Sequence, residues 1–250
     1  MEIKKKELGD LSPEYLTNFE GWESQGLIAW TLERFGSRAA ICTSFQAEGM
    51  VILDQAVQID PTVRVFTIDT GRLSMETSQL IDQVRDRYQI SIEVYHPDQT
   101  ELNQLVSKNG MNPFYASVSL RMRCCEIRKL HPLEQVLPGL DAWITGLRRS
   151  QSNLRGLIPK VSLDQEHGNI LKVNPLADWT EEQVWDYIKE HEVPYNQLYD
   201  QGYTSIGCAP CTRPVTDGEG PRAGRWWWET STTKECGIHF NVADVGEFSS

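Results

Sequence analysis

Short apolar segments alternate with helical patterns along most of this chain of 250 residues. Four segments rich in β-branched residues are short enough to be strands, and the stretches between them space apolar residues as an amphipathic helix does. Strands alternating with helices predict an α/β fold with a mainly parallel twisted sheet flanked by helices. The predicted strands are residues 39–43, 63–68, 90–95 and 142–145, and the predicted helices are 50–57, 80–88 and 180–191, the last opened by a capping box of Thr180 and Gln183.

Polar, loop-forming residues follow three of the predicted strands, at residues 43–49, 69–72 and 146–152. Ligands bind at the carboxyl ends of the strands in open parallel sheets, so we expect these loops to meet at one edge. Each loop alone is typical of an ordinary strand-to-helix turn. Together with the nearby arginines they favour a nucleotide, because N–H groups at helix starts and arginine forks both suit phosphate or sulfate.

The charge of the chain restricts its partners. A formal net charge of -11 argues against binding along nucleic acid, which requires clustered Lys and Arg. The first residues are polar and lysine-rich, and no apolar run approaches the roughly 18 residues of a membrane span, so we expect neither secretion nor membrane insertion. Basic residues do gather locally around Cys124 and Cys125, which keeps a small anion as a candidate ligand.

Six cysteines without a secretion signal predict thiols in a reducing cytoplasm. Cys124 and Cys125 are adjacent, and Cys208 and Cys211 form a CxxC turn. Four thiolates suit either zinc or a 4Fe-4S cluster, and adjacency favours the cluster because its iron atoms offer separate corners. Unligated thiols are the third interpretation, and Cys42, inside a predicted strand, is expected to be a core residue.

Cys236 stands alone near the C-terminus, in the segment KECGIH of residues 234–239. A free thiol with a pKa of about 8.5 is only a few per cent thiolate at neutral pH, so a nucleophile needs stabilisation of its charge. Lys234 or His239 could supply it. An incidental cysteine in the tail is the alternative interpretation.

Several motifs resemble those of the assimilatory adenylyl-sulfate reductases, within the family that reduces adenosine 5′-phosphosulfate (APS) or its 3′-phosphorylated form (PAPS). The resemblance extends from about residue 41 to residue 239, and the loop at residues 44–49 departs from the family pattern at Gln46 and Gly49. The motifs are DTGR (69–72), CCEIRK (124–129), TGLRR (145–149), IGCAPCTRP (206–214), GRWWWE (224–229) and KECGIH (234–239).

The resemblance implies an adenine-nucleotide α-hydrolase-like fold and a role for each group of residues. Cys236 would be the nucleophile that takes the sulfonate from APS and releases AMP, with His239 beside it, and a 4Fe-4S cluster would be held by Cys124, Cys125, Cys208 and Cys211. Thioredoxin or a similar thiol would release sulfite, and family members often form homodimers or homotetramers. The implied substrate-binding residues are Ser44, Phe45, Glu48, Asp69, Thr70, Gly71, Arg72, Lys129, Gly146, Arg148, Arg149, Arg222 and Arg225.

The chain is expected to work as one functional domain in two parts. Residues 1–205 form the predicted nucleotide-binding α/β part with the first cysteine pair, and residues 206–250 form the CxxC turn and a loop-rich, mobile catalytic tail. Two rival functions remain at this point: reduction of PAPS, and a zinc-stapled interaction module. An ATP-using sulfurtransferase would need a pyrophosphate loop of Ser-Gly-Gly type, which the sequence lacks.

Overall fold

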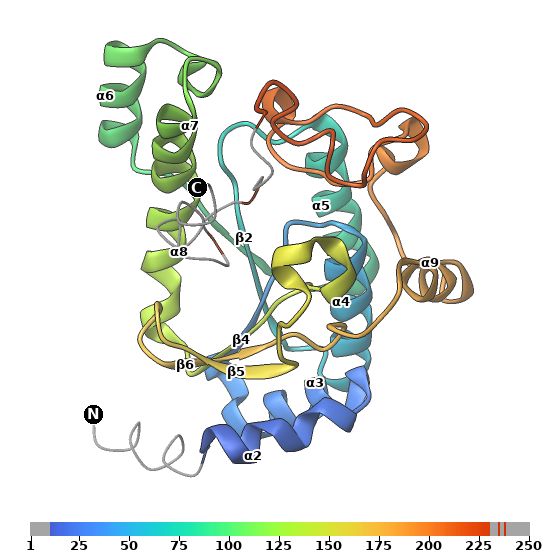
Figure 1. The fold of residues 1–250 in the computed structure, drawn as a ribbon. Coiled ribbons are helices and arrows are strands. Elements are labelled where there is room, and N and C mark those ends of the chain that lie inside the picture. The colour runs from blue at the N-terminus through green and yellow to red at the C-terminus, as the bar shows by residue number, and fades with distance from the viewer. Residues whose placement is uncertain (1–10, 231–234, 236–237, 239–250) are drawn as a thin grey trace. The chain divides into compact units, whose positions relative to one another are not determined.

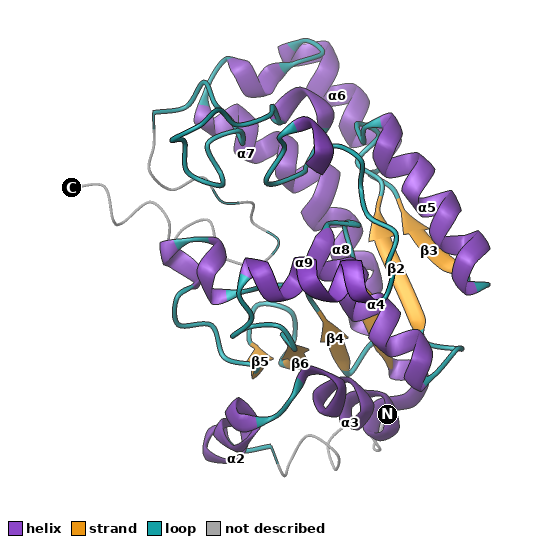
Figure 2. Cartoon of the chain, turned by 90° about the vertical axis from the view of Figure 1, so that its right-hand side faces the viewer, coloured by secondary structure: helices purple, strands orange, loops and turns teal. Residues whose placement is uncertain are grey.

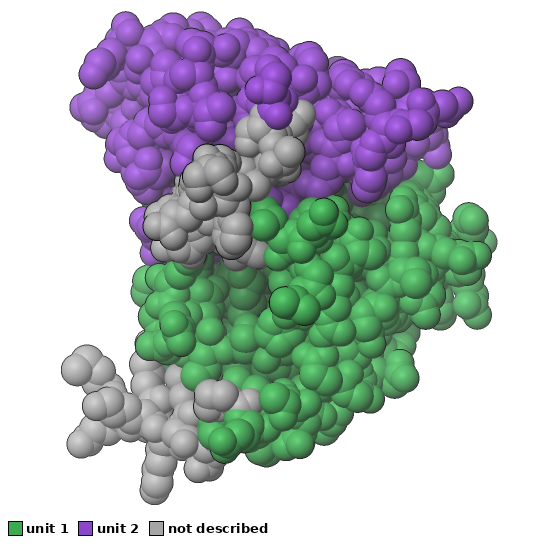
Figure 3. Space-filling model, in the orientation of Figure 1, with its two compact units in different colours: residues 1–67, 79–93, 137–196 green, residues 68–78, 94–136, 197–250 purple. Residues whose placement is uncertain are grey.

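A computed structural model describes residues 11–230, 235 and 238 of the chain. The chain divides into two compact units, coloured separately in Figure 3. Among the described residues, no helix has the length and apolar character needed to cross a bilayer. The predicted division at residues 205 and 206 stays a prediction. Unit 1 comprises Met1–Thr67, Gln79–Glu93 and Leu137–Asn196, and unit 2 comprises Ile68–Ser78, Val94–Val136 and Gln197–Ser250.

A six-stranded sheet has the order β3-β2-β1-β4-β6-β5 (Figures 1 and 2). β1 is parallel to β2 and β4, β4 is parallel to β6, and only β5 is shown antiparallel to its neighbour among the described pairings. The prediction of a mainly parallel sheet is confirmed, and each of the four predicted strands is present. The strands are β1 Ala39–Cys42, β2 Arg64–Ile68, β3 Ile92–Tyr95, β4 Ala142–Ile144, β5 Val161–Asp164 and β6 Ile170–Val173.

The three predicted helices are also present, as α4, α5 and α9. The hydroxyl of Thr180 accepts from the backbone N–H of Gln183, and the Gln183 side chain accepts from the backbone N–H of Thr180, which confirms the predicted capping box. The helices are α2 Pro13–Thr17, α3 Ser24–Phe35, α4 Ala47–Ile59, α5 Met75–Tyr88, α6 Gln99–Asn109, α7 Val118–Cys125, α8 His131–Val136 and α9 Glu181–Glu190.

The core of unit 1 surrounds β1. Ile41 pairs in register with Val65 on β2 and with Ile144 on β4, and all three side chains are buried. α3 contacts β1 and β4, while α4 contacts β1 and is covered in turn by α9. The first ten residues of α4 are all buried, so this helix is packed on every side rather than on one apolar face.

A buried carboxylate joins three helices of unit 1. Asp54 on α4 is 4% exposed and accepts hydrogen bonds of 2.8 Å from the phenol groups of Tyr88 and Tyr187. Gln58 donates a third bond of 2.7 Å. Burial, followed by the hydrogen bond and charge of Asp54, raises the pKa of both tyrosines, so both phenols stay protonated and donate.

Replacing Asp54 with alanine is expected to lower the free energy of unfolding by about 2 kcal/mol, because two phenols and an amide lose their acceptor. Urea denaturation measures the change. The matched control is Asp82→Ala, which removes a carboxylate that is 76% exposed and paired with Arg85, and it should stay within about 0.5 kcal/mol of wild type. An equal loss of unfolding free energy in the two variants would contradict the role of Asp54 in holding the three helices together.

Candidate functional site

The loops that follow β1 and β4 touch each other in unit 1. Phe45 has a φ of +57°, its ring is fully buried, and its backbone N–H donates to the hydroxyl of Thr43 at 3.0 Å. A Cβ on Gly146 would lie 3.0 Å from the Cβ of Glu48 and 3.2 Å from the backbone nitrogen of Gly49. Because the strands are parallel neighbours, their carboxyl ends bring these loops together, as the sequence predicts for the first and third loops.

A buried ion pair fixes the contact between these two loops. The Nε of Arg148 donates to Oε1 of Glu48 at 2.8 Å, and the two side chains are 7% and 11% exposed. Gln151 donates to the same carboxylate oxygen at 2.9 Å and accepts from the backbone N–H of Arg148 at 3.1 Å. Removing one partner of a buried pair is costly because the other charge is left uncompensated.

Arg149 is also paired inside unit 1. Its Nη2 donates to Glu20 at 2.5 Å, and its Nε donates to the carbonyl of Ile158 at 2.9 Å. The structure thus gives Glu48, Arg148 and Arg149 protein partners that hold the loops in place. Their contact with a substrate stays a prediction, as does that of Ser44, whose hydroxyl accepts from the side chain of Gln46 at 3.1 Å.

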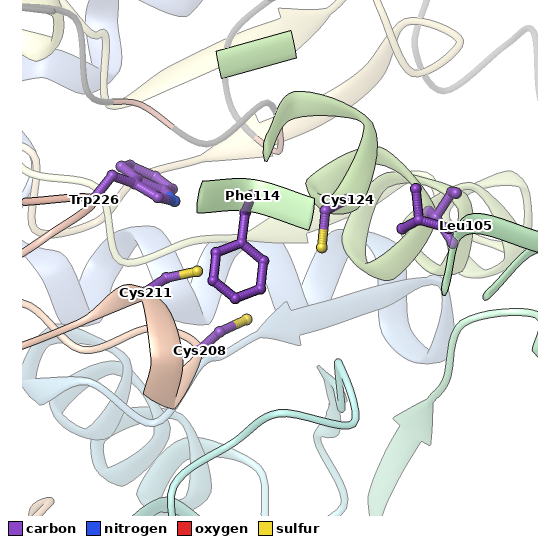
Figure 4. Packing of buried hydrophobic residues seen from close by; sticks show 7 residues of the cluster. Leu105, Phe114, Cys124, Cys208, Cys211 and Trp226 are labelled. Carbon is purple, nitrogen blue, oxygen red and sulfur yellow. The ribbon is translucent and has the colours of Figure 1, made fainter. Parts of the chain in front are cut away.

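Unit 2 brings the four predicted metal-ligating cysteines to one pocket. Cys124 and Cys125 end α7, Cys208 is the N-cap of the short 3₁₀ helix Ala209–Cys211, and Cys211 is its last residue. The space between the lining residues is about 280 Å³, open solvent included. Figure 4 shows the side chains of Cys124, Cys208 and Cys211 gathered around the ring of Phe114. The lining residues are Arg72, Phe114, Arg121, Cys124, Cys125, Arg128, Lys129, Cys208 and Cys211.

A π-helical turn, Glu126–Leu130, follows directly after the cysteine pair. The extra residue in a π turn rotates the following side chains relative to a regular helix, and such turns are frequent at functional sites. It carries Arg128 and Lys129, both less than 10% exposed, and both line the pocket. The chain therefore presents two thiols and two cations to the same space within six residues of sequence, 124–129.

The predicted second loop, residues 69–72, supports this pocket in unit 2. The hydroxyl of Thr70 lies 3.3 Å from the sulfur of Cys208. The backbone carbonyl of Thr70 accepts a hydrogen bond from Arg128 at 2.5 Å. Gly71, at a φ of +67°, turns the loop, and its N–H donates to the side chain of Asp69 at 2.8 Å. Arg72 donates to Asn112 at 2.7 Å and lines the pocket.

Burial controls the protonation of the pocket thiols. It raises the pKa of Cys211 to about 12, with the charge of Cys208 adding to the rise and the charges of Lys129 and Arg225 opposing it. Burial likewise raises the pKa of Cys124, against the charge of Arg128. These thiols are neutral at pH 7 in the absence of a metal, and metal binding would displace their protons.

Three buried N–H donors belong to residues of unit 2. Arg128 lines this pocket, the charge of Arg225 acts on Cys211, and Trp226 belongs to the same hydrophobic cluster as Cys124, Cys208 and Cys211. The Nε atoms of Arg128 and Arg225 and the indole Nε1 of Trp226 have no hydrogen-bond partner among the described residues. A buried donor without an acceptor costs about 1–3 kcal/mol, so an acceptor is expected there. The sulfur atoms of a thiolate-bound cluster accept such bonds, and the nearby cations suit its negative charge. The residues present therefore fit an anionic, sulfur-rich group.

A single metal ion needs ligand atoms that converge more closely than those of a cluster. Within the described part of the chain, no three His, Cys, Asp or Glu side chains converge closely enough to hold one ion. The four cysteines line a shared pocket instead.

The remaining predicted residues fall into two groups. Arg225 is buried, stacks on Trp226 with its guanidinium 4.7 Å from the ring centroid, and donates to Ser205 at 3.2 Å. Arg222 pairs with Glu235 at 3.0 Å. Cys236 and His239 lie outside the described residues, and their catalytic roles stay predictions.

Two sets of site residues escaped the sequence predictions. Gln151 bridges Glu48 and Arg148, and Arg121 makes a buried fork with Glu229, at 3.0 Å for both bonds. Arg121 and Glu229 are 108 positions apart, and no local pattern links them. The basic cluster around Cys124 was the only available signal for Arg121.

Fold and pocket together define an α/β protein in which four of the described cysteines lie among buried cations. The chain matches the phosphoadenosine phosphosulfate reductase domain over residues 38–214. It is 50% identical to the adenosine 5′-phosphosulfate reductase of Allochromatium vinosum, over 79% of this chain and 77% of that protein. The protein of the same name from Burkholderia cepacia is 44% identical, over 93% of this chain and 91% of that protein.

Solved structures agree with this result. A phosphoadenylyl-sulfate reductase from Candida auris, crystallised with phosphate, is 29% identical with a TM-score of 0.69, over 82% of this chain and 98% of that one. FMN adenylyltransferase of Candida glabrata, at 13% identity and a TM-score of 0.57 over 88% of this chain and 74% of that one, shares the fold alone. The chain belongs to the phosphoadenosine phosphosulfate reductase family of oxidoreductases, and the predicted adenine-nucleotide α-hydrolase-like fold is confirmed.

Gly146→Ala tests the close contact between the two loops of unit 1. The added methyl group would force Glu48 and the start of α4 to shift, so we expect the free energy of unfolding to fall by about 1–3 kcal/mol. The control is Gly139→Ala, where the new Cβ would meet no described atom within 4 Å. If Gly146→Ala unfolds at the same urea concentration as wild type, the loops do not constrain each other.

Proposed function

We propose that this protein is a thiol-dependent APS reductase, which converts APS to sulfite and AMP in sulfate assimilation. The observation that carries the proposal is the pocket of four cysteines among buried cations, in a chain 44–50% identical to proteins named adenosine 5′-phosphosulfate reductase. A reductase that works through thiols needs a reducing compartment, which favours the cytoplasm.

The proposed chemistry has two steps. The thiolate of Cys236 attacks the sulfur atom of APS; a sulfur–sulfur bond forms, the bond from sulfur to the phosphate oxygen breaks, and AMP leaves with the electron pair. A thiolate of thioredoxin or a similar dithiol then attacks the Cys236 sulfur and displaces sulfite. The second thiol of the reductant resolves the mixed disulfide, so the dithiol supplies the two electrons.

Buried cations of unit 2 suit the charge that this reaction moves. Lys129, Arg222 and Arg225 are the residues proposed to bind the phosphosulfate, where they offset the charge on departing AMP. Lys129 and Arg225 are 9% and 5% exposed, and a cation removed from water stabilises a developing anion more strongly than an exposed one. The other residues proposed to contact the substrate are Ser44, Phe45, Glu48, Asp69, Thr70, Gly71, Arg72, Gly146, Arg148 and Arg149.

A 4Fe-4S cluster is the proposed cofactor, held by Cys124, Cys125, Cys208 and Cys211. It would supply a fixed negative charge and a structural centre, since the dithiol already accounts for both electrons. A cubane binds each thiolate at a different corner, which suits four thiols that line a shared pocket. Arg128, Arg225 and Trp226 would direct their unpartnered N–H groups toward its sulfur atoms.

Reduction of PAPS is the second candidate function. The observation in its favour is the likeness to the Candida auris phosphoadenylyl-sulfate reductase, at 29% identity and a TM-score of 0.69. The higher identity to proteins named for the unphosphorylated substrate favours APS. Rates of sulfite release from the two nucleotides, with thioredoxin as reductant, separate the candidates.

Cys236→Ser is expected to lower the rate of sulfite release from APS by about 10³-fold or more, because the hydroxyl is not ionised at neutral pH. In wild type incubated with APS and no reductant, mass spectrometry should find a sulfonate on the Cys236 peptide. The control is Cys42→Ser, which removes a thiol inside β1 and should retain the adduct on Cys236. An active wild-type enzyme with an unmodified Cys236 excludes the mechanism.

Iron content tests the cofactor separately. Anaerobically purified protein should be brown and contain about four iron atoms per chain, as a cubane requires. Cys208→Ser and Cys211→Ser should lose that iron, while Cys236→Ser should keep it. Active protein that contains zinc and no iron would overturn the proposed cofactor. The sulfonate adduct on Cys236 would still test the thiol chemistry separately.

A further inference from the structure

The residue that precedes Cys236 in the sequence is held by two arginines. The side chain of Glu235 is 3% exposed, and its Oε2 accepts from Nη2 of Arg222 at 3.0 Å. Its backbone carbonyl accepts from Nη1 of Arg121 at 3.2 Å. Both the side chain and the main chain of this one residue are therefore bonded to guanidinium groups.

Arg121 is itself fixed in place. Its Nε and Nη2 donate to the two carboxylate oxygens of Glu229, each at 3.0 Å, and its guanidinium lies 4.6 Å from the ring centroid of Trp226. A guanidinium held by a carboxylate fork and an aromatic face has little freedom left. Its remaining Nη1 is the group that binds the Glu235 carbonyl.

The position of Arg121 links this contact to the thiol pocket. Arg121 is on α7, three residues before Cys124, so the two side chains are neighbours on the helix surface. Both line the pocket. The helix that carries the cysteine pair therefore also binds the main chain beside Cys236.

We propose that Arg121 and Glu235 are positioning residues for the nucleophile: Arg121 holds the main chain of residue 235, and Glu235 anchors it through Arg222. This inference rests on the proposed function, in which Cys236 attacks APS. It extends that function because neither residue belongs to the expected set of substrate or metal contacts.

The shared arginine gives the proposal a distinctive consequence. Arg222 is assigned to the phosphosulfate, and here it binds the Glu235 carboxylate. A carboxylate and a phosphate compete for the same guanidinium fork. Removing the charge of Glu235 should therefore leave nucleotide affinity equal or tighter while it slows attack by Cys236. A merely structural ion pair would weaken binding and reaction together.

Glu235→Gln tests this with little change of shape. In a single turnover without reductant, we expect the sulfonate to appear on the Cys236 peptide about tenfold more slowly, the factor for one lost charge-assisted bond. AMP binding, measured by calorimetry, should be unchanged or tighter, and iron content should equal that of wild type. Arg121→Lys, which keeps the charge but loses the fork, should slow the same step and leave AMP affinity unchanged.

The matched control is Glu219→Gln, because Glu219 also pairs with an arginine of unit 2, Arg213, at 2.6 Å. It should react as fast as wild type. The inference is overturned if Glu235→Gln and Arg121→Lys form the sulfonate at the wild-type rate. It is also overturned if their rate falls only in proportion to a loss of AMP affinity or of iron content. A wild-type protein that gains no sulfonate overturns the proposed function itself, and this inference with it.

Discussion

Charge balance in the thiol pocket is the constraint on which the arrangement of unit 2 depends. Arg121, Arg128 and Lys129 are each less than 10% exposed, and burying cations is costly unless negative groups accompany them. Glu229 forms an ion pair with Arg121. Protonated thiols supply no charge, and burial keeps the pKa of Cys124 and Cys211 high. Metal-bound thiolates would add negative charge beside these cations, which supports the proposed cluster.

Local chain geometry meets this constraint with few residues. The π turn Glu126–Leu130 follows the cysteine pair without a break in the helical path, so thiols and cations from consecutive positions reach one space. Its outer side is polar: His131 lies 2.6 Å from Glu101, and Glu126 pairs with Arg123 at 2.8 Å. The π turn thus places Arg128 and Lys129 on a buried side, while the side with Glu126 faces ordinary polar neighbours.

The strands and caps that sequence reasoning found are those with local signals. β1 to β4 follow β-branched runs, and the Thr180 capping box lies within four residues of sequence. β5 and β6, each four residues long, were not predicted, and each includes a charged residue. In β6 that residue is Lys172, whose ammonium lies 4.8 Å from the centroid of the Trp143 ring, a partner that only the fold provides.

Charged residues were harder to interpret than apolar ones for a related reason. Arg148 and Glu48 were both predicted to contact a substrate, and a sequence does not show that two charges 100 positions apart neutralise each other. The structure reveals that pairing, and it gives Arg222 a carboxylate partner as well. An arginine at the carboxyl edge of a sheet thus either binds a ligand or supports a loop, and its partners in the structure favour one role over the other.

The thiols themselves point to a division of labour. Nucleophilic attack needs a thiolate, and burial raises the pKa of Cys42 and Cys211 to about 12 and also raises that of Cys124. Metal binding would remove the proton but also occupy the sulfur. A thiol that attacks a substrate is therefore better placed outside this set of raised pKa, and Cys236, which lies beyond the five described cysteines, is the proposed nucleophile. Its reactivity then depends on what holds the chain beside it, which gives the bonds from Arg121 and Arg222 to Glu235 their significance.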